Sequence, residues 1–80
     1  MNENLKNYVY FLMDLPNMEL NLEMYKGLTD ILYHGRNYNP ENVHRYVSKM
    51  YLDVPTFEQF VRERTIISIF PELFGIDPKN

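Results

Sequence analysis

The chain has 80 residues, a formal net charge of -3 and no cysteine, while 45% of its residues are hydrophobic and 15% are aromatic. These values fit one small globular domain, and they exclude a disordered chain, a disulfide scaffold and a thiolate metal site. The mild acidity disfavours non-specific binding to phosphate backbones or anionic lipids. No apolar run reaches the roughly 18 residues of a membrane span, so we expect a soluble, cytoplasmic protein.

The first predicted helix spans 3–14, because apolar residues recur there at the i, i+3, i+4, i+7 spacing of one helix face. Asn2 or Asn4 can cap its start. Tyr10 and Phe11 lie outside that face. The helix therefore has enough apolar surface to contact two neighbours.

The stretch 17–34 fits two templates. Apolar and polar residues alternate over 18–24 as in a strand, but apolar residues also recur at every fourth position from Leu20 to Leu28, as in a helix. Good helix formers dominate, so we predict a helix over 17–34 and leave the strand open for 18–24. Gly27 would weaken a helix by about 1 kcal/mol relative to alanine, which indicates a close helix contact there.

The third predicted helix, 40–52, has the clearest start in the chain. Asn39 is a favourable N-cap and Pro40 is favourable at the first helical position. Apolar residues then recur at helical spacing as far as Tyr51, and the helix ends before Pro55.

The fourth predicted helix, 56–70, is the one that we expect to organise the fold. Thr56 and Gln59 have the spacing of a capping box, in which each side chain bonds the other residue's backbone N–H. After Arg64 the sequence becomes isoleucine-rich and ends in Phe70, and these apolar residues point in nearly every direction around a helix. Such a segment must be enclosed, either by the other helices with this helix central, or by a second molecule.

The predicted fold class is therefore all-α, a single domain built as a small bundle of four helices. Beyond the fourth helix, Pro71 and Gly75 bound a short helical turn at 71–75, and 76–80 reads as a frayed tail.

The sequence carries no recognisable catalytic set. His34 and His44 lack the paired spacing of metal ligands, and the three glycines are scattered, so they form no phosphate loop. Glu19 and Glu23 are explained by a solvated helix face. We therefore expect a protein that is not an enzyme and that needs no metal or cofactor.

The remaining signal is an excess of aromatic and apolar surface. Four tyrosines fall outside the predicted core faces, and Arg36 lies among them in sequence. Arg64 falls in the middle of an apolar helix face. Its stem can lie buried there with the guanidinium reaching an acidic side chain or a carbonyl, or the residue can face a partner. Arginine and aromatic residues are enriched at protein interfaces. The candidate protein-binding residues are Tyr10, Tyr25, Tyr33, Arg36, Tyr38, Arg64, Ile69 and Phe70.

These features favour a small regulator, inhibitor or adaptor that binds another protein, with a homodimer as one form of that association. Two alternatives stay open. The residues from Asn39 to Arg64 could form a helix-turn-helix that reads DNA, although the second helix lacks a basic stripe. The chain could also be a structural subunit of a larger assembly.

Overall fold

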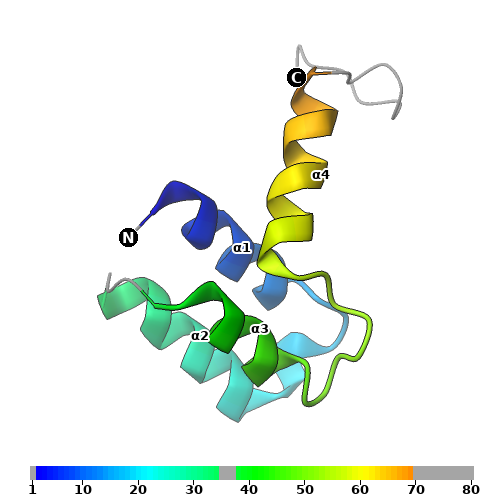
Figure 1. The fold of residues 1–80 in the computed structure, drawn as a ribbon. Helices are drawn as coiled ribbons and strands as arrows, with labels where there is room; N and C mark the ends of the chain where they lie inside the picture. Colours follow the sequence, from blue (N-terminus) through cyan, green and yellow to red (C-terminus); the bar gives the residue numbers. More distant parts are fainter. Residues whose placement is uncertain (1, 35–37, 70–80) are drawn as a thin grey trace.

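The computed structural model of the chain describes residues 2–34 and 38–69, and every regular element among them is helical. Figure 1 shows the arrangement of these helices. In chain order they are α1 (Glu3–Met13), the 3-10 helix η1 (Met18–Leu20), α2 (Leu22–His34), α3 (Pro40–Val47) and α4 (Phe57–Ile69). The predicted all-α bundle of four helices is confirmed. The predicted turn at 71–75 and tail at 76–80 lie outside the described residues.

The central helix is α1. Its side chains Leu5, Tyr8, Val9 and Leu12 are all buried, and it packs against both α2 and α4. Asn2 caps its start, since the side-chain oxygen accepts hydrogen bonds from two backbone N–H groups of the first turn. The prediction that the fourth helix is central is therefore wrong. Its buried side chains lie between these two helices, whereas α4 has a single buried residue.

The second predicted helix is shorter than expected. Asn17 takes a left-handed conformation with φ 64°, and the chain then makes only the short helix η1 before breaking at Asn21. The Asn21 side chain accepts a hydrogen bond from the backbone N–H of Met24 at 3.3 Å, so it caps α2. The helix thus begins at Leu22, not at residue 17, and no strand forms over 18–24.

The third helix also ends early, at Val47 instead of residue 52. The Ser48 hydroxyl donates to the carbonyl of His44 at 2.7 Å, and the N–H of Met50 bonds the carbonyl of Val47, three residues back. Side-chain bonds of this kind compete with the regular helical pattern. A connection from Ser48 to Thr56 therefore links α3 to α4.

The predicted close contact at Gly27 is confirmed. A Cβ atom placed on this glycine would lie 2.8 Å from the hydroxyl oxygen of Tyr46, a residue of α3. Glycine thus lets the tyrosine ring of α3 lie directly against the backbone of α2.

An aromatic cluster joins α1 to the base of α4. The ring of Tyr8 lies 5.5 Å from that of Phe57 and 5.2 Å from that of Phe60, while Phe11 lies 5.1 Å from Phe60. These centroid distances are typical of favourable aromatic pairs. The Tyr8 hydroxyl donates to the carbonyl of Pro55 at 2.7 Å, so the same residue also fixes the chain where it enters α4.

We expect Tyr8→Phe to lower the free energy of unfolding by about 1–2 kcal/mol, because it removes this hydrogen bond and leaves the Pro55 carbonyl without its donor. Urea denaturation at neutral pH measures the change. The matched control is Tyr10→Phe on the same helix, whose side chain is 50% exposed and whose replacement should change the value by less than about 0.5 kcal/mol. Equal losses in both variants would contradict the assigned role.

Burial raises the pKa of Tyr8 from its ordinary value of 10.0 to about 12. The unfolded chain therefore loses this proton at lower pH than the folded chain does. The resulting stabilisation is complete below about pH 10 and is lost as the pH rises towards about 12. We expect the free energy of unfolding to fall in that window by up to about 1.4 kcal/mol per pH unit. Urea titrations between about pH 9 and 11 should give a shallower fall for Tyr8→Phe, and parallel slopes would refute the assignment.

Candidate protein-binding surface

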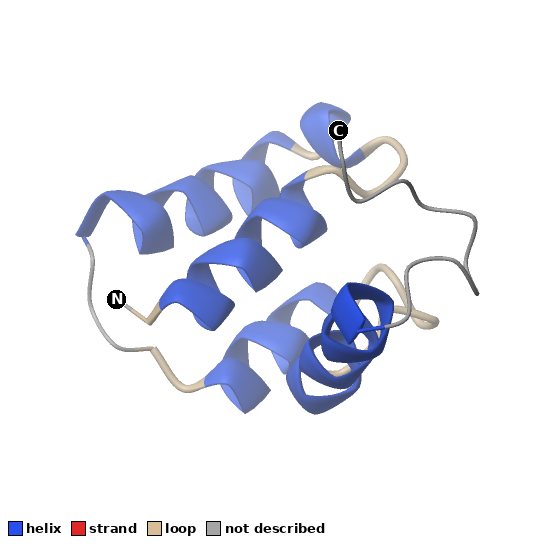
Figure 2. Ribbon diagram, turned by 90° about the horizontal axis from the view of Figure 1, so that it is seen from above, coloured by secondary structure: helices blue, strands red, loops and turns tan. Residues whose placement is uncertain are grey.

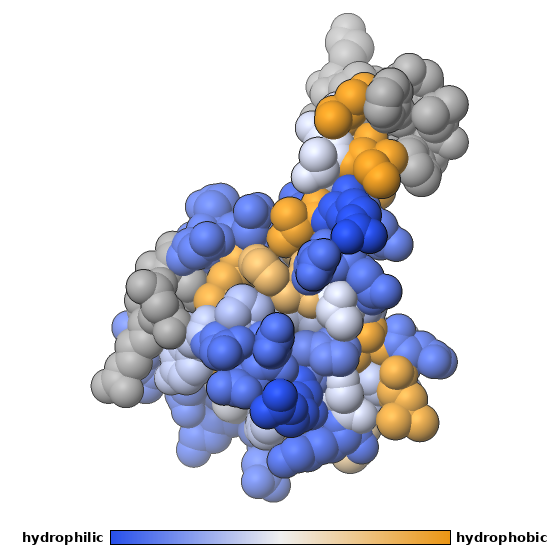
Figure 3. Space-filling model, viewed as in Figure 1, coloured by the Kyte–Doolittle hydropathy of each residue, from blue (hydrophilic) through white to orange (hydrophobic). Residues whose placement is uncertain are grey.

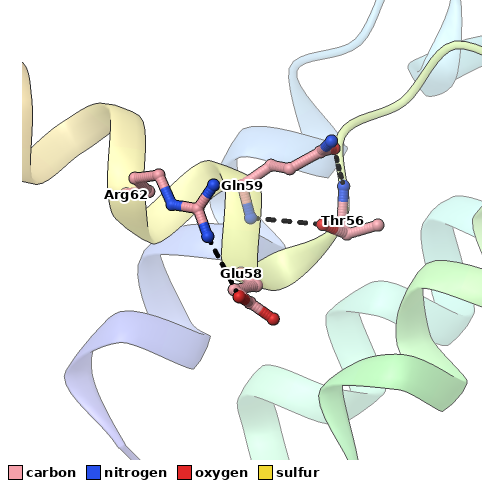
Figure 4. Close-up of polar contacts among 4 residues, drawn as sticks. All are labelled: Thr56, Glu58, Gln59 and Arg62. Atoms are coloured by element: carbon pink, nitrogen blue, oxygen red, sulfur yellow. Dashed lines mark hydrogen bonds and ion pairs between the residues drawn. The ribbon is translucent and has the colours of Figure 1, made fainter.

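The capping box predicted for the fourth helix fixes where α4 begins. The backbone N–H of Gln59 donates to the Thr56 hydroxyl oxygen at 3.2 Å, and the backbone N–H of Thr56 donates to the Gln59 side-chain oxygen at 3.0 Å. Figure 4 shows both bonds beside the ion pair of Glu58 and Arg62. The prediction is confirmed, and the reciprocal bonds satisfy two N–H groups at the entrance to the helix.

Only the first half of α4 is packed against the bundle. Phe60 is its single buried residue, whereas Phe57 and Val61 are half-buried against the core. The second half stands away from the other helices in Figure 1, and α4 is viewed nearly end-on in Figure 2. The isoleucine-rich segment is therefore not enclosed by its own bundle.

Two of the three isoleucines at the end of α4, Ile66 and Ile69, face away from the bundle, whereas Ile67 is half-buried. Ile66 follows Phe57 by nine residues, and Ile69 follows Phe60 by nine, which is about two and a half turns in each pair. Each isoleucine thus lies on the side of the helix opposite its packed phenylalanine. Ile66 is 40% exposed and Ile69 is 60% exposed. In Figure 3 hydrophobic side chains stand on the projecting part of α4, clear of the body.

These isoleucines belong to one continuous stripe along α4, which we call the outer face. Its residues recur at spacings of three and four, so they share one side of the helix. The outer face consists of Gln59, Arg62, Glu63, Ile66 and Ile69, all exposed. It is polar at the base of the helix and apolar at the tip.

A hollow of about 430 Å³ lies beside the polar half of the outer face, and we call it the base hollow. Gln59, Arg62 and Glu63 form one wall, and the connection before α4 forms the other, from Leu52 to Pro55. Leu52 is 87% exposed. One side of the molecule thus combines two outward isoleucines with an open recess that has a leucine on its wall.

The charges on the outer face are solvated. Arg62 and Glu58 form an ion pair at 3.1 Å, but their side chains are 66% and 82% exposed, so the pair adds little to stability. Glu63 directly follows Arg62, so a negatively charged side chain stands beside a positively charged one. A partner that meets this point therefore finds both a donor and an acceptor.

Arg64 does not share the outer face. Its guanidinium carbon lies 5.4 Å from the ring centroid of Phe60, on the side of α4 that faces the bundle. The residue is exposed, and its guanidinium stacks on an aromatic ring. This contact explains how an arginine occupies the apolar face of the predicted helix.

The structure does not gather the predicted tyrosines into one site. Tyr10 is 50% exposed on α1 and Tyr33 is 83% exposed on α2, whereas Tyr25 packs against the core. Tyr38 lies at a separate hollow with Pro40 and residues of α1 and α4. No hydrogen bond or ring contact joins any two of the predicted residues within the part of the chain that the structure describes. Arg36 and Phe70 lie outside that part.

Sequence reasoning identified only Ile69 of this surface, and it missed Gln59, Arg62, Glu63 and Ile66 of the outer face and Leu52 of the base hollow. The spacing did hold a signal, because Ile66 and Ile69 continue the polar row of Gln59 and Arg62 and not the apolar row of Phe57 and Phe60. That signal predicts outward isoleucines once the packed side of the helix is known.

Another hollow, of about 660 Å³, lies between α3 and the start of α4 and is lined in part by His44 and Ser48. The His44 ring donates from Nε2 to the carbonyl of Val54 at 3.2 Å, and the Ser48 hydroxyl donates to the carbonyl of His44 at 2.7 Å. Both groups thus bond backbone carbonyls, and the Ser48 hydroxyl oxygen also lies 3.3 Å from Nε2 of the same histidine ring. Within residues 2–34 and 38–69, no three His, Asp or Glu side chains come together as metal ligands would.

The connection between α3 and α4 differs from that of a helix-turn-helix, which joins its helices by a turn of about 3–4 residues. Here the connection runs from Ser48 to Thr56. The described helices are also too short or too polar to traverse a lipid bilayer.

No protein-family model matches the sequence, and no curated protein or solved structure matches the chain. What the surface does must therefore follow from its own residues.

Because Ile66 and Ile69 do not pack against the bundle, we expect the double variant Ile66→Gln/Ile69→Gln to retain its free energy of unfolding within about 0.5 kcal/mol at low protein concentration. Phe60→Ala, on the packed side of the same helix, should lose about 3–5 kcal/mol. Urea denaturation followed by circular dichroism compares the two. A large loss in the double variant would show that the isoleucines are core residues.

Proposed function

We propose that this chain is a small non-enzymatic protein that acts by binding another protein, as a regulator, inhibitor or adaptor, through the outer face of α4 and the base hollow. The observation that carries the proposal is the outward placement of Ile66 and Ile69, which are 40% and 60% exposed. Exposed apolar side chains gathered on one rigid element are typical of interaction sites, whereas isolated ones need no explanation.

The helical form of the surface supports this reading. The capping box fixes the start of α4, and the aromatic cluster holds its first half on α1, so the second half is presented in a defined direction. A helix that is already formed loses little conformational entropy when it binds. Helices of this kind are recognised through side chains spaced three and four residues apart. Ile66 follows Arg62 by four residues, and Ile69 follows Ile66 by three.

Affinity capture with the immobilised full chain tests the proposal. We expect proteins retained by the natural chain to be lost with Ile66→Gln/Ile69→Gln, because the variant removes the apolar contact while keeping the helix. The matched control is Leu20→Gln/Leu22→Gln, which alters the last residue of η1 and the first of α2, leucines that are 74% and 76% exposed. Retention that is the same for both variants, or no retained protein together with no self-association, would overturn the proposal.

A further inference from the structure

We infer that the partner of the outer face is a second copy of this chain, with the two α4 helices antiparallel and the tip of each seated in the base hollow of the other. This inference rests on the proposed function, because it names the occupant of the same surface. Three properties of the surface point to self-association: its two-fold symmetric layout, its charge order and its size.

The layout is self-complementary. The apolar tip and the base hollow lie on the same side of α4, and Arg62 and Glu63 lie between them. Ile69 follows Arg62 by seven residues, and Pro55 precedes Arg62 by seven. A two-fold axis near Arg62 and Glu63 therefore brings each tip onto the other copy's hollow. An isologous dimer requires this arrangement, in which one patch contains both the protruding and the receiving part.

The register follows from helix geometry. When the axis passes between Arg62 and Glu63, Ile66 faces the partner's Gln59, and Ile69 faces the partner's Thr56. Gln59 lines the base hollow, and Thr56 directly follows Pro55 of the opposite wall, which also includes the exposed Leu52. The two isoleucines then lose part of their contact with water at the partner's base hollow, whose lining holds Leu52, Val54 and Pro55 beside polar and charged residues.

The charges select the antiparallel orientation. With the same axis, Arg62 faces the partner's Glu63 and Glu63 faces the partner's Arg62, so two opposite-charge contacts form. A parallel pair would place each of these residues against its own copy and bring like charges together. Arg62 keeps its bond to Glu58 at 3.1 Å, because a guanidinium has five N–H donors and can serve two carboxylates.

The size of the surface sets the strength of the association. A standard interface buries about 800 Å² on each partner, whereas this chain has 6061 Å² of accessible surface in total. α4 is only about 20 Å long and 10–12 Å wide, so one face of it with one hollow supplies less than the standard area. We therefore expect reversible dimers with a dissociation constant in the micromolar range, and not an obligate dimer.

Sedimentation velocity on the full chain, over about 5–500 µM, tests the inference. The natural chain should pass from monomer to twice its mass of 9.7 kDa. Arg62→Glu should weaken the dimer at least about tenfold, since two acidic residues then meet. The double variant Arg62→Glu/Glu63→Arg should restore association to within about threefold, because the charge pairs are reversed but still opposite.

Engineered cysteines test the orientation, since the chain has none of its own. Glu63→Cys lies at the two-fold axis, so we expect it to form an intermolecular disulfide under mild oxidation. Ile69→Cys should not, because the two tips lie about 20 Å apart in the antiparallel pair. Tyr33→Cys, at an exposed position of α2, is the control for random collision and should stay monomeric.

Three results would overturn the inference: a chain that stays monomeric throughout the range, a dimer that ignores Arg62→Glu, or an Ile69→Cys disulfide that forms as fast as that of Glu63→Cys. These outcomes are distinct from failure of the proposed function. A monomeric chain that still captures a different protein through Ile66 and Ile69 would retain the function and refute self-association. Circular dichroism of each variant separates loss of binding from loss of the helix.

Discussion

The fold depends on the contacts of Tyr8. Its ring lies in van der Waals range of Phe57 and Phe60, and its hydroxyl donates to the carbonyl of Pro55. One side chain of α1 thus fixes both the entry to α4 and the side on which α4 packs. Because a small domain buries a limited apolar area, this cluster accounts for much of what holds the last helix in place. The pKa of Tyr8, raised by burial, reflects the same loss of contact with water.

A consequence of that attachment is that α4 has two halves with different roles. The first half contributes Phe60 to the core and begins with the capping box. The second half extends past the other described helices, and its residues Ile66 and Ile69 are exposed. Moving an isoleucine side chain out of water lowers the free energy of the system. The surface that is costly for a lone molecule is therefore the one best suited to hold a partner.

The sequence predicted what local chemistry decides. Asn39 with Pro40 and Thr56 with Gln59 fixed the starts of α3 and α4, because cap bonds involve residues three or fewer positions apart. The C-terminal end of α3 and the start of α2 were predicted wrongly; side-chain bonds of Ser48 and Asn21 accompany these boundaries. The central position given to the fourth helix also failed. Hydrophobic spacing reports which residues share a face, but not whether the chain supplies a neighbour for that face.

The candidate site was predicted only in part for the same reason. Ile69 was identified, but the four tyrosines proposed beside it lie on other elements, because exposure on separate helices does not imply proximity in space. Leu52 had been assigned to a helix that the structure ends at Val47. Its place beside Arg62 and Glu63 arises from the tertiary path of the connection, which no local pattern encodes.

The hydrogen bond from Tyr8 to Pro55 joins residues 47 positions apart, and this separation governs the order of events on the ribosome. Translation supplies α1 and α2 well before the segment that covers the Tyr8 ring. Until Phe60 has been added, the nascent chain carries an open aromatic pocket on its first helix. Closing so long a loop costs entropy that only the completed cluster offsets. The native core around Tyr8 therefore forms only after the start of α4 has been synthesised.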